Sequence, residues 1–174
     1  IPRVPQITLD DSIALYSVHG IALALSANNL PKGHTAVVFD HDHTAPTYAA
    51  ALALTGCFQR VIVATPRTHI AQAVNYCSAL GIHRRLDEAE VEVLTGIEPI
   101  SGNNKQLHLR HVFSRRTRVI DEVSTLVYST PRQVVAAHLA DVRSDVDIHL
   151  IGDCMAPRNL YIAMHEGHAL GASL

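Results

Sequence analysis

The sequence lacks the features that mark a secreted or membrane-bound protein. Its three cysteines, Cys57, Cys77 and Cys154, are an odd number without CxxC spacing, which predicts free thiols in a reducing compartment, the cytoplasm, rather than a disulfide framework. No apolar run reaches the length of a membrane-spanning helix, and residues 1–11 lack the basic end and apolar stretch of a signal peptide. The chain also lacks a starting Met and begins like a linker, so we expect it to be a fragment of a larger protein.

The sequence is also poor in charge. Charged residues make up 17% of the 174 residues and the formal net charge is −2, which argues against a surface that neutralises phosphates with clustered Lys and Arg. The one basic cluster, residues 115–118, is interrupted by Thr117 and leads into an apolar run, so we interpret it as a solvated strand face. Hydrophobic residues make up 48%, and a chain of this length can bury a core without staples.

The first half of the chain alternates short apolar runs with an Ala- and Leu-rich segment. Residues 36–40 predict a buried strand, residues 47–55 a helix that ends before Gly56, and residues 60–65 a second buried strand. Strand–helix–strand order with short apolar runs is typical of a βαβ unit, and therefore of an α/β fold with a parallel sheet. A right-handed crossover places the helix over one face of that sheet.

The rest of the chain mixes helical and alternating patterns. The predicted helices cover residues 12–25, 69–81, 131–142 and 159–172, and a further strand covers residues 147–153. Three segments alternate apolar with polar residues: 89–103, 105–113 and 115–130. With a turn at residues 102–104, they predict an antiparallel, half-exposed β-meander inserted after the βαβ unit.

The turn after the first predicted strand, "FDHDHTAP", contains no glycine. In dinucleotide-binding folds this turn carries GxGxxG, because glycines allow the tight turn and the close approach of the backbone to a pyrophosphate. Asp40 and Asp42 would also repel phosphates, so this turn predicts that normal pyrophosphate binding is absent. Successive residues of an extended segment point to opposite sides, so Asp40 with Asp42, or His41 with His43, could share a metal ion. We favour a solvated loop.

Two other motifs resemble catalytic sites only superficially. Residues 165–168, "HEGH", place two histidines three apart, whereas the metalloprotease motif HExxH places them four apart on one helical face, so we interpret them as ordinary helix histidines. Cys154 has no identified neighbour that would activate it as a nucleophile, and we expect a buried structural thiol. The twelve histidines are scattered, which argues against a single site.

The pair Gly152-Asp153 ends the predicted strand 147–153 shortly before the last helix. This arrangement places a carboxylate beside the free N–H groups of a helix N-terminus. Asp153 could accept a hydrogen bond from a ribose or ribityl hydroxyl while the helix N-terminus faces a phosphate. Asp153 could equally satisfy backbone N–H groups of the turn, and the two residues alone do not decide between these interpretations.

Four stretches carry a resemblance to a known family: "AVVFDHDHTAPTYAAALALTG", "RVIVAT", "TLVYSTPRQ" and, above all, "HLIGDCMAPRNLYIAMHEGHALG". With them, nearly the whole chain resembles the C-terminal region of the trimethylamine dehydrogenase and 2,4-dienoyl-CoA reductase type of NADH:flavin oxidoreductases. The most specific element is Ile/Leu-Gly-Asp, two residues, Ala-Pro-Arg and then a helix that ends in Gly-His. The first turn without glycines is similar to that of the amine-dehydrogenase branch.

The resemblance implies a parent enzyme with an N-terminal TIM barrel that carries FMN and a 4Fe–4S cluster. Two domains similar to the FAD and NAD(P)H domains of glutathione-reductase-type enzymes would follow, the second inserted into the first. Residues 1–33 would be a linker from the FAD/ADP-binding-like domain, residues 34–144 the inserted NAD(P)-binding-like domain, and residues 145–174 the returning strand and helix. The implied fold class is α/β: a Rossmann-like, three-layer domain with an antiparallel β-meander, plus that terminal strand and helix.

The resemblance also implies a cofactor pocket. Gly152 and Asp153 match a Gly-Asp pair that borders FAD or ADP in these folds, and Ala156, Pro157 and Arg158 would lie beside the pocket. The upstream glycine-rich turn is missing here, so this chain would supply one wall. FMN and the cluster would belong to the parent alone, and the turn at residues 39–46 argues against NAD(H) binding.

We therefore expect a fragment of a flavin-dependent oxidoreductase that acts on an amine, an N-methylated amino compound or an enoyl-type substrate. The fragment would hold no catalytic residue and no metal site. Its partner would be the rest of the parent polypeptide, with self-association through exposed apolar surface, and neither nucleic acid nor a membrane. The alternatives are a stand-alone, non-catalytic nucleotide-binding or interaction module, and a small metal-dependent hydrolase that uses the His/Asp loop.

Overall fold

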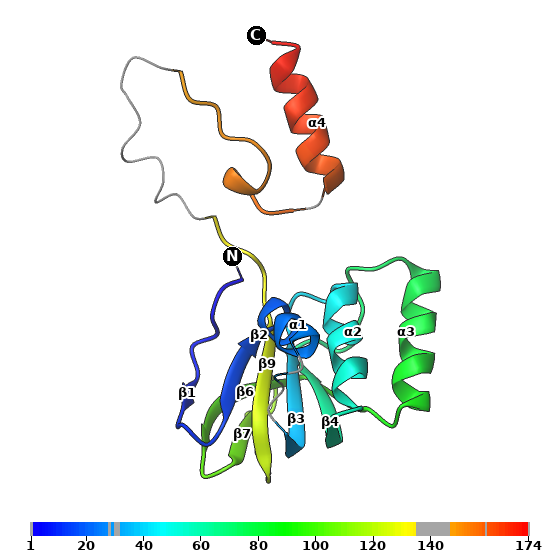
Figure 1. Ribbon diagram of the computed structural model, residues 1–174, viewed down its shortest axis with the longest axis vertical. Coiled ribbons are helices and arrows are strands. Elements are labelled where there is room, and N and C mark those ends of the chain that lie inside the picture. Colours follow the sequence, from blue (N-terminus) through cyan, green and yellow to red (C-terminus); the bar gives the residue numbers. More distant parts are fainter. Residues whose placement is uncertain (1, 28, 30–31, 135–146, 159, 174) are drawn as a thin grey trace. The chain divides into compact units, whose positions relative to one another are not determined.

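The computed structural model separates the chain into two compact units (Figure 1). One is Val4–Thr130; the other combines Ile1–Arg3 with Pro131–Leu174. The structure describes residues 2–27, 29, 32–134, 147–158 and 160–173. None of the helices among them is long and apolar enough to cross a membrane.

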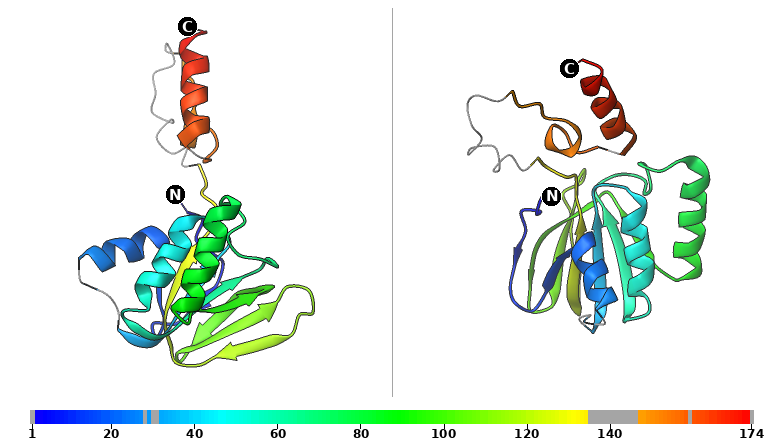
Figure 2. Two further views of the ribbon diagram at one scale, coloured as in Figure 1. Left: turned by 90° about the vertical axis from the view of Figure 1, so that its right-hand side faces the viewer. Right: turned by 45° about the horizontal axis from the view of Figure 1, so that its top comes forward.

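The unit Val4–Thr130 has three layers (Figures 1 and 2). Its helices are α1 (Val18–Ser26), α2 (Ala45–Leu54) and α3 (Tyr76–Glu88). Its strands are β1 (Thr8–Leu9), β2 (Ala14–Ser17), β3 (Gly33–Asp40), β4 (Phe58–Thr65), β5 (Glu92–Thr95), β6 (Ile97–Asn103), β7 (Gln106–His111), β8 (Thr117–Ile120) and β9 (Val123–Ser129). The helices cover one face of a five-stranded sheet and a four-stranded sheet covers the other.

The central sheet is parallel throughout, in the order β2-β9-β3-β4-β5. Its inner strands, β9, β3 and β4, are largely buried on both faces, which explains the uninterrupted apolar run at the heart of β3. Val38 packs into the core beneath the helices, whereas Val37 and Phe39 pack into the core between the two sheets. The α/β, three-layer, Rossmann-like fold expected from the sequence is confirmed.

The second sheet has the order β1-β6-β7-β8. Strands β6, β7 and β8 form an antiparallel meander, and β1 pairs with β6 in parallel. The β6–β7 turn has Asn104 (φ +49°) and Lys105 (φ +60°) at its centre, the pattern of a type I′ hairpin. Gly102, just before this turn, leaves no room for a side chain. A Cβ there would lie 2.7 Å from Ile13 Cδ1 and 2.8 Å from Leu9 Cδ2.

Three sequence predictions need correction in this unit. β5 and β9 fall within the predicted meander, yet both are parallel strands of the central sheet. The helix predicted over residues 69–81 begins instead at Tyr76, because the Asn75 side chain accepts the Ser78 N–H and caps it there. The helix predicted over residues 12–25 is strand β2 followed by α1.

The second unit contains a 3-10 turn, η1 (Gly152–Cys154), and helix α4 (Leu160–Gly171), which packs against it. Residues 2 and 132 form an isolated antiparallel bridge. The predicted C-terminal helix is confirmed, whereas the strand predicted over residues 147–153 is not formed. Most of the helix predicted over 131–142 lies outside the described residues. The domain boundaries at 33 and 144 stay a prediction, with β1, β2 and α1 inside the unit Val4–Thr130.

Candidate functional site

The carboxyl ends of three neighbouring strands form a row of polar side chains. Asp40 ends β3, Ser129 ends β9 and pairs with it in register, and Thr65 ends β4 on the other side. All three lie on the face that the helices cover and all three are buried, with no exposed surface on Asp40. This edge is the place where doubly wound folds bind their ligands.

Asp40 is held by groups from α2 and from its own turn. The Tyr48 hydroxyl donates to Oδ2 at 2.5 Å, and the His43 backbone N–H donates to Oδ1 at 2.9 Å. The Tyr48 oxygen in turn accepts the Ala71 N–H. The His43 ring lies alongside, with Nδ1 3.4 Å from Oδ2 but not in hydrogen-bonding geometry.

The segment between β4 and α3 closes over this cluster. The Ala73 N–H donates to the His43 carbonyl oxygen at 3.2 Å, and the His43 Nε2 lies 3.3 Å from the Thr65 hydroxyl. Ile70 and Ala71 are buried against the core. The segment that contains Ile70, Ala71 and Ala73 therefore packs against the turn between β3 and α2.

Burial controls the charge state of the cluster. It raises the pKa of Asp40, against the opposing effects of the Tyr48 hydrogen bond and of His43. Burial lowers the pKa of His43. The nearby Asp40 carboxylate opposes this by raising that pKa, whereas the positive charge of Arg67 lowers it further. Burial also raises the pKa of Tyr48, so the hydroxyl stays a donor. Both members of the Asp40–His43 pair are thus biased toward their uncharged forms.

The backbone of this turn is not available to a phosphate. The N–H groups of His41 and Asp42 donate to the Ser129 carbonyl oxygen at 2.8 and 3.1 Å, and that of His43 to Asp40. A pyrophosphate site needs such N–H groups to be free and the backbone to be open to close approach. The residues present therefore do not fit a dinucleotide at this edge.

The solvated-loop interpretation of the "DHDH" stretch is wrong for Asp40 and His43. His43 is only 2% exposed and adopts φ +58°, which turns its ring back toward Asp40. The residues that approach each other are thus three apart, rather than the alternate pairs expected of an extended segment. Among the described residues, no group of three His, Cys, Asp or Glu side chains could hold a metal ion.

The second candidate site is the Gly152-Asp153 turn. Gly152 has φ +59°, and a Cβ there would lie 3.3 Å from the Ala163 Cβ of α4, so glycine suits both the backbone and the packing. Its N–H donates to Glu166 Oε2 at 2.7 Å, and the Arg158 guanidinium binds Glu166 Oε1. Glu166 thus joins both ends of the turn to α4.

A pocket of about 370 Å³ lies on this turn. The residues that line it are Arg132, Asp153, Arg158, Leu160 and Ala163. Two of the five predicted site residues, Asp153 and Arg158, thus belong to it. The other three, Gly152, Ala156 and Pro157, belong to the turn but are not among the residues that line the pocket. Within the turn, the Ala156 N–H donates to the Gly152 carbonyl oxygen at 3.0 Å. Their role in cofactor binding stays a prediction.

Sequence reasoning missed two residues that bind this turn, Arg132 and Glu166. Glu166 is the single acidic residue of α4, a signal that the comparison with HExxH obscured. Arg132 lies some twenty residues away in sequence and carried no signal beyond the "TLVYSTPRQ" stretch. Cys154, expected to be buried, is exposed.

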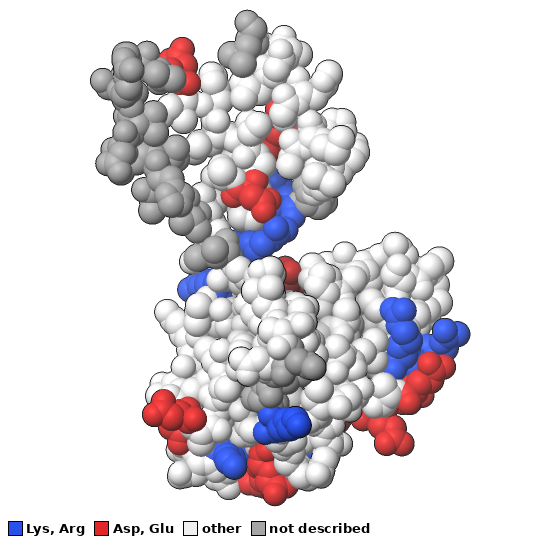
Figure 3. Space-filling model, in the orientation of Figure 1, with Lys and Arg blue, Asp and Glu red and all other residues white. Residues whose placement is uncertain are grey.

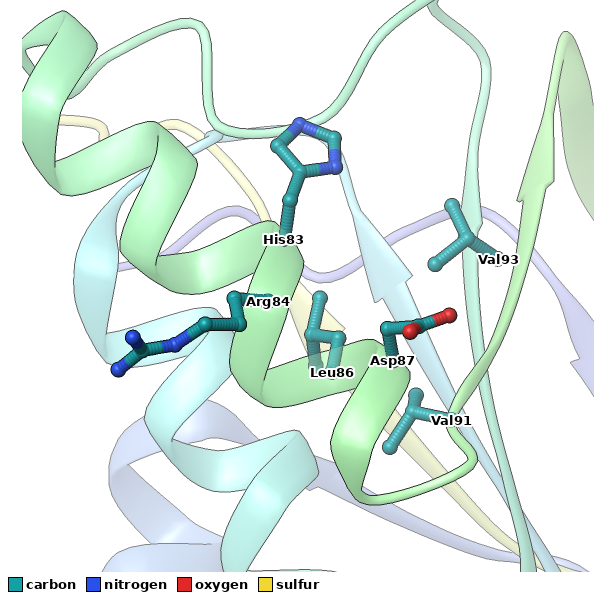
Figure 4. Close-up of a pocket in the computed structure, with 6 residues that line it drawn as sticks. All are labelled: His83, Arg84, Leu86, Asp87, Val91 and Val93. Carbon is teal, nitrogen blue, oxygen red and sulfur yellow. The ribbon is translucent and has the colours of Figure 1, made fainter.

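Another hollow lies beside α3, at the edge strand β5 (Figure 4). It has a volume of about 530 Å³ and is lined by His83, Arg84, Leu86, Asp87, Val91 and Val93. The polar side chains come from one face of α3 and diverge from one another in Figure 4. This arrangement lacks the convergent polar groups of a binding site.

The surface charge is mixed. On the face shown in Figure 3, the Lys and Arg side chains of the described residues lie among Asp and Glu and form no continuous basic patch. Arg60 and Arg118 both bind Glu92, and Arg110 binds Glu98. This distribution is the one expected of solvated strand faces.

The sequence matches no protein-family model and no curated protein sequence. Its fold is similar to that of histamine dehydrogenase from Rhizobium sp. 4-9, with a TM-score of 0.81 and 20% identity over 99% of this chain and 28% of that chain. It is similar to 6-hydroxypseudooxynicotine amine oxidase from Pseudomonas geniculata N1, with a TM-score of 0.76 and 17% identity over 90% and 24% of the two chains. It is similar to 2-naphthoyl-CoA reductase, with a TM-score of 0.73 and 18% identity over 100% and 26%.

The three similar structures are a dehydrogenase, an amine oxidase and a reductase, all oxidoreductases by name. This chain spans about a quarter of the length of each. At these identities the similarity establishes the fold.

Proposed function

We propose that this chain is the C-terminal, nucleotide-binding-like part of a larger flavin-dependent oxidoreductase that acts on an amine or an enoyl-type substrate. One observation carries the proposal: 99% of the chain follows the fold of histamine dehydrogenase, yet it accounts for only 28% of that protein. The parent would carry FMN and an iron–sulfur cluster in the part outside this chain. The expected partner is the remaining polypeptide, and the expected location is the cytoplasm.

The second unit supports this proposal by what it leaves exposed. None of the described residues between 147 and 173 is buried. Helix α4 has only twelve residues, a length at which an isolated helix is marginal in water. An apolar segment without a core of its own needs further protein to pack against.

The two candidate sites suit different roles. The Asp153 carboxylate and the Arg158 guanidinium at the 370 Å³ pocket could hold the hydroxyl and phosphate groups of FAD or ADP, and bound flavin would supply the redox chemistry. At the sheet edge, the internally bonded N–H groups argue against NAD(H). Among the described residues, no acid–base pair in either place is free to act on a substrate, so the isolated chain is proposed to be inactive.

The size of the natural protein tests the proposal. An antibody raised against this chain should detect a band several-fold larger in an extract of the source cells. The protein purified on that antibody should show the visible absorption of bound flavin. A band at the 18.9 kDa of this chain would contradict the proposal and favour a stand-alone module.

A further inference from the structure

Arg132 connects two parts of the Gly152–Arg158 turn that lie five residues apart. One guanidinium nitrogen, Nη1, donates to Asp153 Oδ2 at 2.9 Å, and the other, Nη2, donates to the Arg158 carbonyl oxygen at 2.6 Å. A planar guanidinium can serve two acceptors at once, whereas a lysine ammonium is a single point of charge on a flexible stem. Arg132 thus bridges the start and the end of the turn.

The two contacts restrict the Asp153 carboxylate. Its side chain is 56% exposed and would rotate freely without a partner. Because Arg132 binds Oδ2, the other oxygen, Oδ1, keeps its acceptor capacity, and it has no hydrogen-bond partner among the described residues. Arg132 also lines the same 370 Å³ pocket as Asp153 and Arg158.

Glu166 of α4 holds the same turn through other atoms. It accepts the Gly152 N–H at 2.7 Å and binds the Arg158 side chain, so each end of the turn has a charged partner from another segment. With the Gly152 N–H bound to Glu166 and Asp153 Oδ2 bound to Arg132, Asp153 Oδ1 is the side-chain oxygen that can accept from a ligand.

We propose that Arg132 is a positioning residue of the nucleotide pocket: it fixes Asp153 so that Oδ1 accepts a ribose or ribityl hydroxyl. This inference rests on the proposed function, because it assigns a ligand to the same pocket. It adds Arg132, which follows β9 near the start of the second unit. Arg132 acts through Asp153 and not through direct contact with the hydroxyl. Arg132→Lys should therefore fail to replace it even though the charge is kept.

Two measurements on the 174-residue chain test the inference. In hydrogen–deuterium exchange, Arg132→Ala should raise the exchange rate of the amides in residues 152–158 about three- to tenfold, the range expected for half-exposed charge-assisted hydrogen bonds. Arg132→Lys should restore less than half of that protection. Arg116→Ala, an exposed arginine of the other unit, is the matched control and should change nothing there. Unchanged exchange in Arg132→Ala would overturn the inference.

Calorimetric titration with ADP tests whether Arg132 affects nucleotide binding. Arg132→Ala and Asp153→Ala should each weaken ADP binding about threefold to tenfold, and the double variant should lose little more than either single one. Additive losses, or wild-type affinity in Arg132→Ala, would overturn the positioning role. Faster exchange in Arg132→Ala together with no ADP binding by the wild-type chain would overturn the ligand part of the inference, because the wall that this chain supplies would not hold a nucleotide by itself. Arg132 would then be a clamp on the turn alone.

Discussion

The Tyr48 hydroxyl compensates the burial of the Asp40 carboxyl at the end of β3. It donates to Asp40 at 2.5 Å and accepts the Ala71 N–H, so it also ties the segment after β4 to the strand end. Tyr48→Phe removes the hydrogen-bond partner of the buried Asp40 Oδ2 and of the Ala71 N–H, while Asp40 Oδ1 keeps the His43 N–H. We expect the free energy of unfolding to fall by about 1–3 kcal/mol, the cost of a buried unsatisfied polar group.

Urea denaturation of the full chain would measure this loss. Tyr16→Phe is the matched control, because Tyr16 packs against the same core but its hydroxyl has no hydrogen-bond partner among the described residues. The control should lie within about 0.5 kcal/mol of the wild type. Equal stability of the two variants would show that the Asp40 carboxyl does not depend on Tyr48.

His43 should make the folded domain sensitive to acid. Burial lowers its pKa below the ordinary value of 6.5, so below pH 6.5 the unfolded chain binds more protons at this residue than the folded one. Stability is therefore lost as pH falls from 6.5 toward the folded pKa. Asp40 acts in the opposite sense, because its raised pKa gives a contribution that is lost as pH rises above 3.8.

A comparison of His43→Gln with the wild type isolates the histidine, since Asp40 is present in both. The wild type should lose more stability between pH 7.5 and pH 5 than the variant does, as measured by urea midpoints at the two pH values. His69→Gln, at an exposed histidine, should keep the wild-type difference. A variant with the full wild-type acid sensitivity would place the titrating group elsewhere.

At the scale of elements, β3 and β9 approach too closely for any side chain at residue 33. A Cβ on Gly33 would lie 1.8 Å from the Ser124 Oγ and 2.7 Å from the Ser124 Cβ. Gly33→Ala should therefore push the start of β3 away from β9 and lower the free energy of unfolding by about 1–3 kcal/mol.

A second change at Ser124 should restore part of the stability that Gly33→Ala loses. In urea denaturation, Gly33→Ala combined with Ser124→Gly should lose less stability than the two single changes added together, because the second change removes the clash. Gly81→Ala in α3 is the control, since a Cβ there meets nothing within 4 Å and alanine favours the helix. Strictly additive losses would mean that Gly33 is needed for a reason other than Ser124.

Elements with a strong local signal were predictable from the sequence. β3, α2 and β4 follow from apolar runs and a capped Ala-rich segment, and α4 follows from its period. The sheet to which β5 and β9 belong was not predictable, because a short strand has the same residue pattern whether its neighbour is parallel or antiparallel. The difference arises from pairing with β3 and β4, residues far away in sequence.

The residues of the candidate sites were likewise predictable only where the signal was local in the sequence. Gly152 and Asp153 stood out because the pair lies at the boundary between two predicted elements. The burial of His43 could not be foreseen, since it depends on a positive φ and on the Ala73 contact across thirty residues. Arg132 depends on a contact across twenty-one residues, for which local periodicity carries no information.

At the scale of the whole molecule, the two units differ in how they bury apolar groups. The unit Val4–Thr130 contains two complete hydrophobic cores, one on each face of the parallel sheet. The segment 147–173 contains no buried residue among those described, and its exposed large apolar side chains are Ile148, Leu150, Ile151, Met155, Leu160, Tyr161 and Met164. Exposed apolar surface of this kind promotes association.

We expect the 174-residue chain to self-associate and a piece cut to residues 4–130 to stay monomeric, because the piece keeps β1, both sheets and both cores. Sedimentation velocity over a hundredfold concentration range would separate the two. Leu160→Gln combined with Met164→Gln should shift the full chain toward the monomer, while Val119→Gln on the meander should not. A monomeric full chain would mean that these apolar side chains are covered within the chain itself, which would contradict a need for further protein to pack against.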